Sequence, residues 1–132
     1  LAVLDVHQHS NVPPIKRMAQ VGRALMVGIG ATCESLRVPL RMTGLDCRPV
    51  LTWDVPVDQR MLVQSLLQQE LAGGVLTHPS ALNPSAAHDG NVVNEILTWF
   101  ANALASTAEY LSWPNPVDAL RGDLIQPACT RP

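Results

Sequence analysis

The stretch VPLRMTGLDCRPVLTWD (residues 38–54) indicates a β-hairpin, and it determines what the flanking helices can pack against. Pro39 ends any preceding helix, because the residue before a proline is pushed out of the helical region. Polar and apolar residues alternate over 40–43, a turn follows at 44–46, and residues 49–53 form a more apolar run. This pattern predicts two strands joined by a short connection.

Upstream of the hairpin, the sequence has the spacing of an amphipathic helix. Apolar residues recur every three or four positions over residues 15–33, as they do on one face of a helix. Gly22 lies on that face, which indicates close packing against another element. Residues 1–7 are mostly apolar and lack a capping residue, as expected of a helix that is cut through its middle.

Downstream of the hairpin, two more helices are expected. Leucines and valines form one stripe over residues 62–71, and Gly73 and Gly74 then end the helix. Asp89 is a suitable N-cap for a last helix. Its apolar residues, from 92 to 111, keep a regular spacing of 3.6.

Two short segments between these helices resemble strands. Residues 75–77 predict a third strand and residues 85–88 a fourth. The fold class is therefore α+β, with a small, mostly antiparallel sheet of three to four strands and helices packed on one face. We expect residues 1–112 to form the domain and residues 113–132 to form a proline-punctuated tail.

Composition excludes several classes of function. The 132 residues are 47% hydrophobic and 15% charged, with a net charge of -2, so nothing favours nucleic-acid binding. No apolar run is long enough to span a membrane. The three cysteines, Cys33, Cys47 and Cys129, form no CxxC pair and leave an odd count. We interpret them as reduced thiols packed in the interior of a cytoplasmic protein.

The loop GGVLTHPSALNPSAAHD (residues 73–89) lies between two helical segments and holds two of the four histidines, two serines and two prolines. His78, His88 and Asp89 could supply metal ligands, but a spacing of ten residues matches no dedicated zinc pattern. A structural or substrate-facing role for these histidines is favoured over a metal site.

Other candidate chemistry is weaker. His7 and His9 would point in different directions on a helix, which argues against a shared metal. Neither Ser80 nor Ser85 lies in a G-x-S-x-G sequence, and no acid is placed to orient a base. We therefore predict no metal site and no catalytic residue in this chain.

Three stretches, taken in order, resemble the C-terminal small domain of class III pyridoxal-phosphate (PLP) aminotransferases. They are RMAQVGRALMVGI (17–29), the hairpin sequence (38–54) and LLQQELAGGVLTHPSALNPSAAHDGNVVNEIL (66–97). The resemblance covers most of residues 1–111 and is strongest to the branch around glutamate-1-semialdehyde aminomutase. It implies that the loop borders an active-site cleft between this domain and a large domain, with Ser80, Ser85 and His88 nearest the substrate.

The same resemblance implies that catalysis needs another part of the protein. In this family PLP is held by a lysine of the large domain. The sole lysine here, Lys16, matches a region downstream of it, and no arginine lies between Arg60 and Arg121 to bind a carboxylate. The chain is thus expected to hold no cofactor and to be inactive alone.

Two functions remain open from the sequence. In the first, the chain is a fragment or subunit that works with a large PLP-binding domain. In the second, it is a free-standing non-enzymatic domain that self-associates as a homo-oligomer, or binds a partner, through the face that a large domain would cover.

Overall fold

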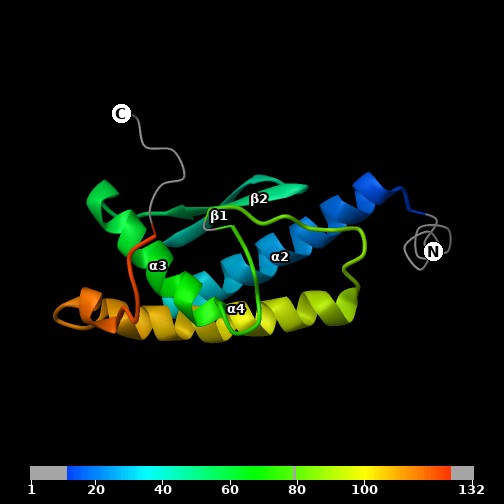
Figure 1. Ribbon diagram of the computed structural model, residues 1–132. Coiled ribbons are helices and arrows are strands. Elements are labelled where there is room, and N and C mark those ends of the chain that lie inside the picture. Colours follow the sequence, from blue (N-terminus) through cyan, green and yellow to red (C-terminus); the bar gives the residue numbers. More distant parts are fainter. Residues whose placement is uncertain (1–11, 79, 126–132) are drawn as a thin grey trace, which may run out of the picture.

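The computed structural model describes residues 12–78 and 80–125, and within them it has an α+β architecture (Figure 1). The expected helix over residues 1–7, with His7 and His9, lies outside the described residues. In chain order the elements are α2 (Pro14–Leu36), β1 (Leu40–Leu45), β2 (Arg48–Trp53), the short 3-10 helix η1 (Val57–Gln59), α3 (Arg60–Leu71), α4 (Gly90–Leu111) and the 3-10 helix η2 (Pro116–Ala119).

The predicted hairpin is present. β1 and β2 pair antiparallel, from Leu40 opposite Trp53 to Leu45 opposite Arg48. Gly44 has φ of 84°, in the left-handed region that side chains disfavour, so the chain needs glycine where the hairpin begins to turn. The hydroxyl oxygens of Thr43 and Thr52 lie 2.7 Å apart across the strands, a pair that stabilises the sheet locally.

The predicted strand count of three to four is wrong, because the described residues form a two-stranded sheet. Residues 75–77 are not a strand: the Gln68 side-chain amide of α3 donates to the Thr77 hydroxyl at 3.0 Å and contacts its carbonyl at 3.4 Å. The segment is thus held by a helix side chain. The expected third strand does not pair with β2. Instead, the loop residue Ala81 forms a single bridge with Val50 of β2.

Residues 85–88 are also not a strand. The Ser85 hydroxyl accepts the Ala87 N–H at 3.1 Å, and the Ser85 carbonyl accepts the His88 N–H at 3.1 Å. Short polar side chains often compete in this way for backbone groups that a sheet would otherwise pair. The segment therefore turns and leads into α4.

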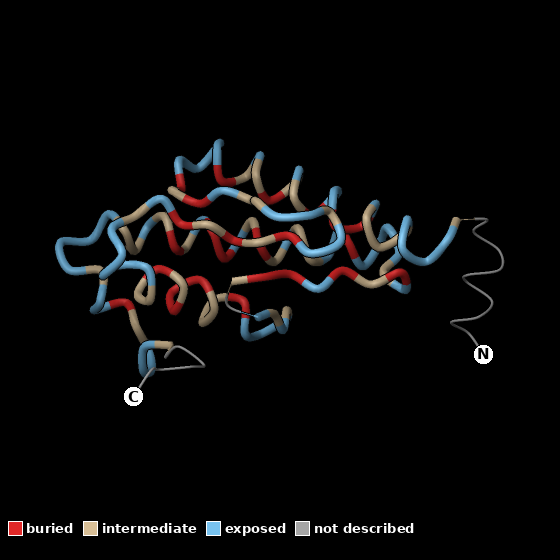
Figure 2. Tube along the Cα trace, turned by 90° about the horizontal axis from the view of Figure 1, so that it is seen from above, coloured by how far each residue is buried: buried red, intermediate tan, exposed pale blue. Residues whose placement is uncertain are grey.

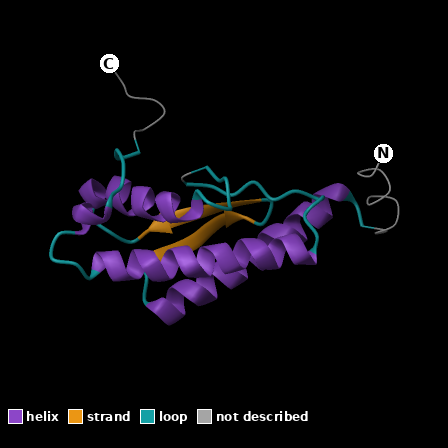
Figure 3. Ribbon diagram, turned by 60° about the horizontal axis from the view of Figure 1, so that its bottom comes forward, coloured by secondary structure: helices purple, strands orange, loops and turns teal. Residues whose placement is uncertain are grey.

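The helix α2 lies against the hairpin on one side and against α4 on the other. A Cβ on Gly22 would collide with the backbone carbonyl of Asp46, and one on Gly28 would meet the Leu97 side chain of α4 at 2.6 Å. The close packing expected at Gly22 is confirmed. Figure 3 shows α2 and α4 on the same side of the hairpin.

The last helix begins as predicted. The Asp89 carboxylate accepts the Val92 N–H at 2.9 Å, which satisfies one of the free donors of the first turn. Phe100 and Leu104 are fully buried in one core cluster with residues of α2, α3 and the hairpin. Figure 2 shows buried positions recurring along the helical parts of the trace. Among the described residues, none of the helices is both long enough and apolar enough to cross a membrane.

The two cysteines within the described residues, Cys33 and Cys47, differ in burial. Cys33 is buried on α2, and burial raises the pKa of its thiol to about 11. Cys47 is exposed in the hairpin turn, so the expectation that it packs in the interior is wrong. A turn between two paired strands points away from the core, which explains its exposure. Cys129 lies outside the described residues.

Candidate functional site

A groove of about 580 Å³ lies between the loop that follows α3 and the first half of α4. We call it the loop groove. Leu25 of α2 contributes to its lining, so the site draws on two helices, α2 and α4, and on the loop between α3 and α4. Its described lining residues are Leu25, Gly74, Val75, Leu76, Thr77, His78, Leu82, Asn83, His88, Val92 and Ile96.

His88 reaches the loop groove from the turn that precedes α4. Its Nδ1 accepts the backbone N–H of Ser85 at 3.3 Å. A ring nitrogen that accepts a hydrogen bond carries no proton, so the neutral imidazole has its proton on Nε2. Ser85 thus fixes the tautomer of His88 and leaves Nε2–H as the donor of the ring.

His78 repeats this arrangement on the opposite part of the loop. Its Nδ1 accepts the backbone N–H of Ser80 at 3.2 Å, and the Ser80 hydroxyl lies at the same distance. The same reasoning places the proton of the neutral His78 ring on Nε2. Two histidines therefore line the groove, and each is held by a serine two or three residues away.

The candidate residues expected from the sequence, Ser80, Ser85 and His88, differ in how they relate to the groove. His88 lines the loop groove, whereas Ser80 and Ser85 are the partners of the two histidines. Asn83 and Thr77 also line the groove, and the sequence analysis missed them as site residues. The cluster of polar residues between Gly73 and Asp89 is the signal that could have indicated them.

The described lining of the loop groove contains none of the charged groups that usually hold PLP. PLP enzymes bind the aldehyde carbon through a lysine and pair the pyridine nitrogen with an Asp or Arg. Lys16 is exposed in the first turn of α2 and does not line the groove, and no Asp, Glu or Arg is among the described lining residues. No cluster of three or more His, Cys, Asp or Glu suited to a metal ion occurs in residues 12–78 and 80–125.

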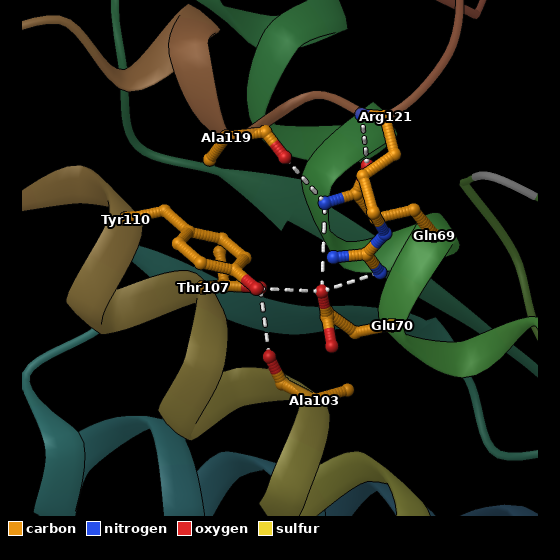
Figure 4. Close-up of polar contacts among 7 residues, drawn as sticks. All are labelled: Gln69, Glu70, Ala103, Thr107, Tyr110, Ala119 and Arg121. Atoms are coloured by element: carbon orange, nitrogen blue, oxygen red, sulfur yellow. Dashed lines mark hydrogen bonds and ion pairs between the residues drawn. The ribbon is translucent and has the colours of Figure 1, made fainter.

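A second polar cluster joins α3, α4 and the segment after η2 (Figure 4). The Glu70 carboxylate accepts the Tyr110 hydroxyl at 2.8 Å and the Arg121 guanidinium at 2.9 Å. Gln69 donates its amide to the Ala119 carbonyl at 2.9 Å and accepts the Arg121 N–H at 3.0 Å. These groups are paired with one another, so the cluster attaches the C-terminal segment to α3.

The charge of Glu70 is stabilised by this cluster. Its side chain is 18% exposed. Partial burial alone would raise the pKa of Glu70, but the hydrogen bonds from Tyr110 and Arg121 outweigh it and hold the pKa below its ordinary value. The folded protein therefore favours the ionised carboxylate.

The chain matches no protein-family model and no curated protein sequence. It does have the fold of one part of a larger protein of known structure. That protein is the FumI protein of Sphingopyxis sp. MTA144, whose structure is in the PLP internal aldimine form. The TM-score is 0.67 at 23% sequence identity, and the match covers 83% of this chain and 26% of the FumI chain. The chain thus spans about a quarter of the length of that protein.

Proposed function

We propose that this chain is the small-domain portion of a PLP-dependent, aminotransferase-like protein and that the loop groove forms one wall of its substrate cleft. The observation that supports this proposal is the shared fold with a part of the FumI protein, which carries PLP as an internal aldimine. The ordered resemblance of residues 17–29, 38–54 and 66–97 to class III aminotransferases supports it independently. Those same segments are what favour the glutamate-1-semialdehyde aminomutase branch.

In this proposal, catalysis is divided between two parts of the protein. The large part would bind PLP through its own lysine, and this chain would contribute groups that contact the substrate. His88 would face the substrate, with Ser80 and Ser85 holding the two histidines in place. The sequence position and exposure of Lys16 favour a lysine elsewhere for the cofactor.

The test is a chimera in which the matching quarter of the FumI protein is replaced by the full present chain. We expect the chimera to form the internal aldimine, read from its absorbance, and to transfer an amino group in a single turnover. The control is the FumI protein without that quarter. A chimera that is monodisperse and holds PLP, yet transfers no more than this control, would contradict the proposal. A Lys16→Ala chimera should keep the aldimine.

A second measurement decides the matter if the chimera does not fold. The isotope-labelled chain is mixed with the truncated FumI protein, and the amide shifts are followed by NMR. We expect the shifts to concentrate at residues 75–92. Shifts confined to the opposite side of the molecule, or none at saturating concentration, would count against the small-domain role.

A free-standing, self-associating domain is the second candidate. The observation in its favour is that α2 leaves Ile15 76% exposed and Val27 63% exposed, and exposed apolar side chains often mark interfaces. Light scattering after size exclusion tests it: a closed oligomer that Val27→Asp dissociates would support this role. A monomer unaffected by that change would exclude self-association through Val27.

A further inference from the structure

The strand β1 is paired with β2 along one edge and is open along the other. In an antiparallel pair, residues that bond the opposite strand alternate with residues whose backbone groups point away from it. Leu51 and Pro49 of β2 point away from β1, because the Leu51 N–H donates to a loop carbonyl at 2.9 Å and the Pro49 carbonyl accepts a loop N–H at 2.8 Å. Met42 and Gly44 lie opposite them on β1. Both groups of Met42 and the N–H of Gly44 are therefore directed toward the open edge.

This open edge lacks the usual protection of an exposed strand. Within residues 12–78 and 80–125, no backbone hydrogen bond from another segment reaches Met42 or Gly44. Folded proteins commonly protect such an edge with a proline, a bulge or charged side chains. The strand β1 contains no proline, and its charged residue, Arg41, donates to the Asp54 carboxylate at 2.9 Å. The edge is thus available to pair with a further strand.

A groove of about 610 Å³ lies between β1 and α2, the helix that runs alongside the hairpin (Figure 1). We call it the edge groove. Its lining positions on α2 recur every three or four residues, so they form one stripe along a flank of the helix. They are Arg23, Met26, Val27, Gly30 and Glu34.

The stripe on α2 is complementary to itself in the reverse direction. Arg23 and Glu34 carry opposite charges near its two ends. Between them, Val27 is 63% exposed, and a Cβ on Gly30 would have no atom within 4 Å. The pairs 23 with 34 and 27 with 30 share one midpoint, between residues 28 and 29. If two copies of α2 lie antiparallel about that midpoint, each Arg23 meets a Glu34 and each Val27 meets the open space at a Gly30.

The same twofold axis suits the two open strand edges. Gly22 of α2 lies against the Asp46 carbonyl at the hairpin turn, and the Cys33 carbonyl accepts the Val38 N–H at 2.9 Å just before β1 begins. The midpoint of the stripe therefore lies beside the middle of β1, close to Met42. Rotation about an axis there sets the two β1 strands antiparallel, which is the arrangement that antiparallel pairing requires.

We propose that the chain binds a second copy of itself through the open edge of β1, forming a continuous four-stranded antiparallel sheet with the two α2 helices antiparallel beside the axis. The contact is the same surface on both copies, so it closes at a dimer. It assigns self-association to a defined surface and does not rest on the small-domain role, since a small domain can pair in the same way.

The experiment uses the full chain. Light scattering over a range of concentrations should show a monomer–dimer equilibrium without larger species. Hydrogen exchange followed by NMR should show the Met42 and Gly44 amides exchanging at least about tenfold more slowly in the dimer than in the dilute monomer, because pairing closes the open edge. A chain that stays monomeric at about 1 mM overturns the proposal. A dimer in which the Met42 amide exchanges as in the monomer also overturns it.

One variant weakens the dimer without weakening the fold. Gly30→Leu replaces glycine by a better helix former where no atom lies within 4 Å, so the monomer should keep its structure. The added side chain occupies the space that Val27 of the second copy would fill, so association should weaken at least about tenfold. Ala31→Leu is the matched control, since Ala31 is exposed on α2 and does not line the edge groove; it should change association less than about twofold. Unchanged association in Gly30→Leu refutes the assignment.

Charge reversal tests the antiparallel arrangement of α2. Arg23→Glu and Glu34→Arg should each weaken association about fivefold, because each brings like charges together across the axis. The double variant restores opposite charges and should return association to within about twofold of the wild type. A double variant that associates as weakly as either single variant would overturn this arrangement.

The two proposals fail separately. A chimera that transfers amino groups, together with an isolated chain that stays monomeric, would overturn the strand pairing and leave the small-domain role intact. A dimer with protected Met42 and Gly44 amides, together with an inactive but PLP-loaded chimera, would do the reverse.

Discussion

A glycine pair on α2 provides a direct test of the packing between this helix and the hairpin. Gly22→Ala adds a methyl group that would collide with the Asp46 backbone carbonyl, whereas Gly30→Ala adds the same group where no atom lies within 4 Å. Both residues are interior positions of the same helix. The two changes therefore have the same effect on helix propensity and differ in the space available.

The magnitudes decide the sign of each effect. Alanine is favoured over glycine in a helix interior by about 1 kcal/mol, so Gly30→Ala should raise the free energy of unfolding by about that amount. Overpacking against a neighbour costs about 1–3 kcal/mol, and the upper value applies at Gly22 because backbone must move. Gly22→Ala should then lower the free energy of unfolding by about 2 kcal/mol, a difference of about 3 kcal/mol between the variants.

Urea unfolding followed by circular dichroism measures this difference. With a slope of about 1.5 kcal/mol per molar urea, the two midpoints should differ by about 2 M. Equal midpoints would refute the reasoning, because they would mean that α2 does not approach the hairpin turn as closely as described. A Gly30→Ala variant that is less stable than the wild type would refute the assigned open space instead.

Three further predictions follow from single side chains. Asp89→Ala should lower the free energy of unfolding by about 1 kcal/mol through loss of the α4 cap, measured by the same urea titration; no change would mean the cap is dispensable. Glu70 has a lowered pKa in the folded state, so its contribution to stability is complete above the ordinary value of 4.5 and is lost as pH falls below it; Glu70→Gln should flatten the dependence of the melting temperature on pH in that range, and an unchanged profile would contradict this. Iodoacetamide at neutral pH should label Cys47 in the folded protein and Cys33 only after unfolding, because Cys33 is buried with a pKa of about 11; mass spectrometry identifies the labelled residue, and rapid native labelling of Cys33 would count against its burial.

The long helices and the hairpin could be predicted because their patterns are local. The apolar spacing of α2 and α4 repeats over many turns, and the Asp89 cap depends on a residue three positions away. Residues 75–77 could not be assigned correctly because a run of three apolar or branched residues fits a strand as well as a loop. What decides the matter is Gln68, whose side chain reaches Thr77 from a helix.

The candidate site was only partly accessible to sequence reasoning. The loop was indicated by its polar composition, but the contribution of Leu25 and Ile96 to the groove depends on how α2 and α4 pack. The pairing of Glu70 with Tyr110 and Arg121 joins residues 40 and 51 positions apart, and no periodic signal connects them. Contacts of this kind follow from the fold as a whole.

The attachment of the C-terminal segment to α3 has a consequence for the order of folding. Arg121 binds Gln69 across 52 residues, and the Ile125 N–H binds the Ser65 hydroxyl across 60. Closing such long loops costs chain entropy before any contact is gained, whereas the hairpin forms between near neighbours. The segment should therefore dock last and detach first, with the amide protons of Arg121 and Ile125 exchanging before those of the helices. Each detachment would return Glu70 to solvent and leave α3 open along one side, as a native-like state that precedes global unfolding.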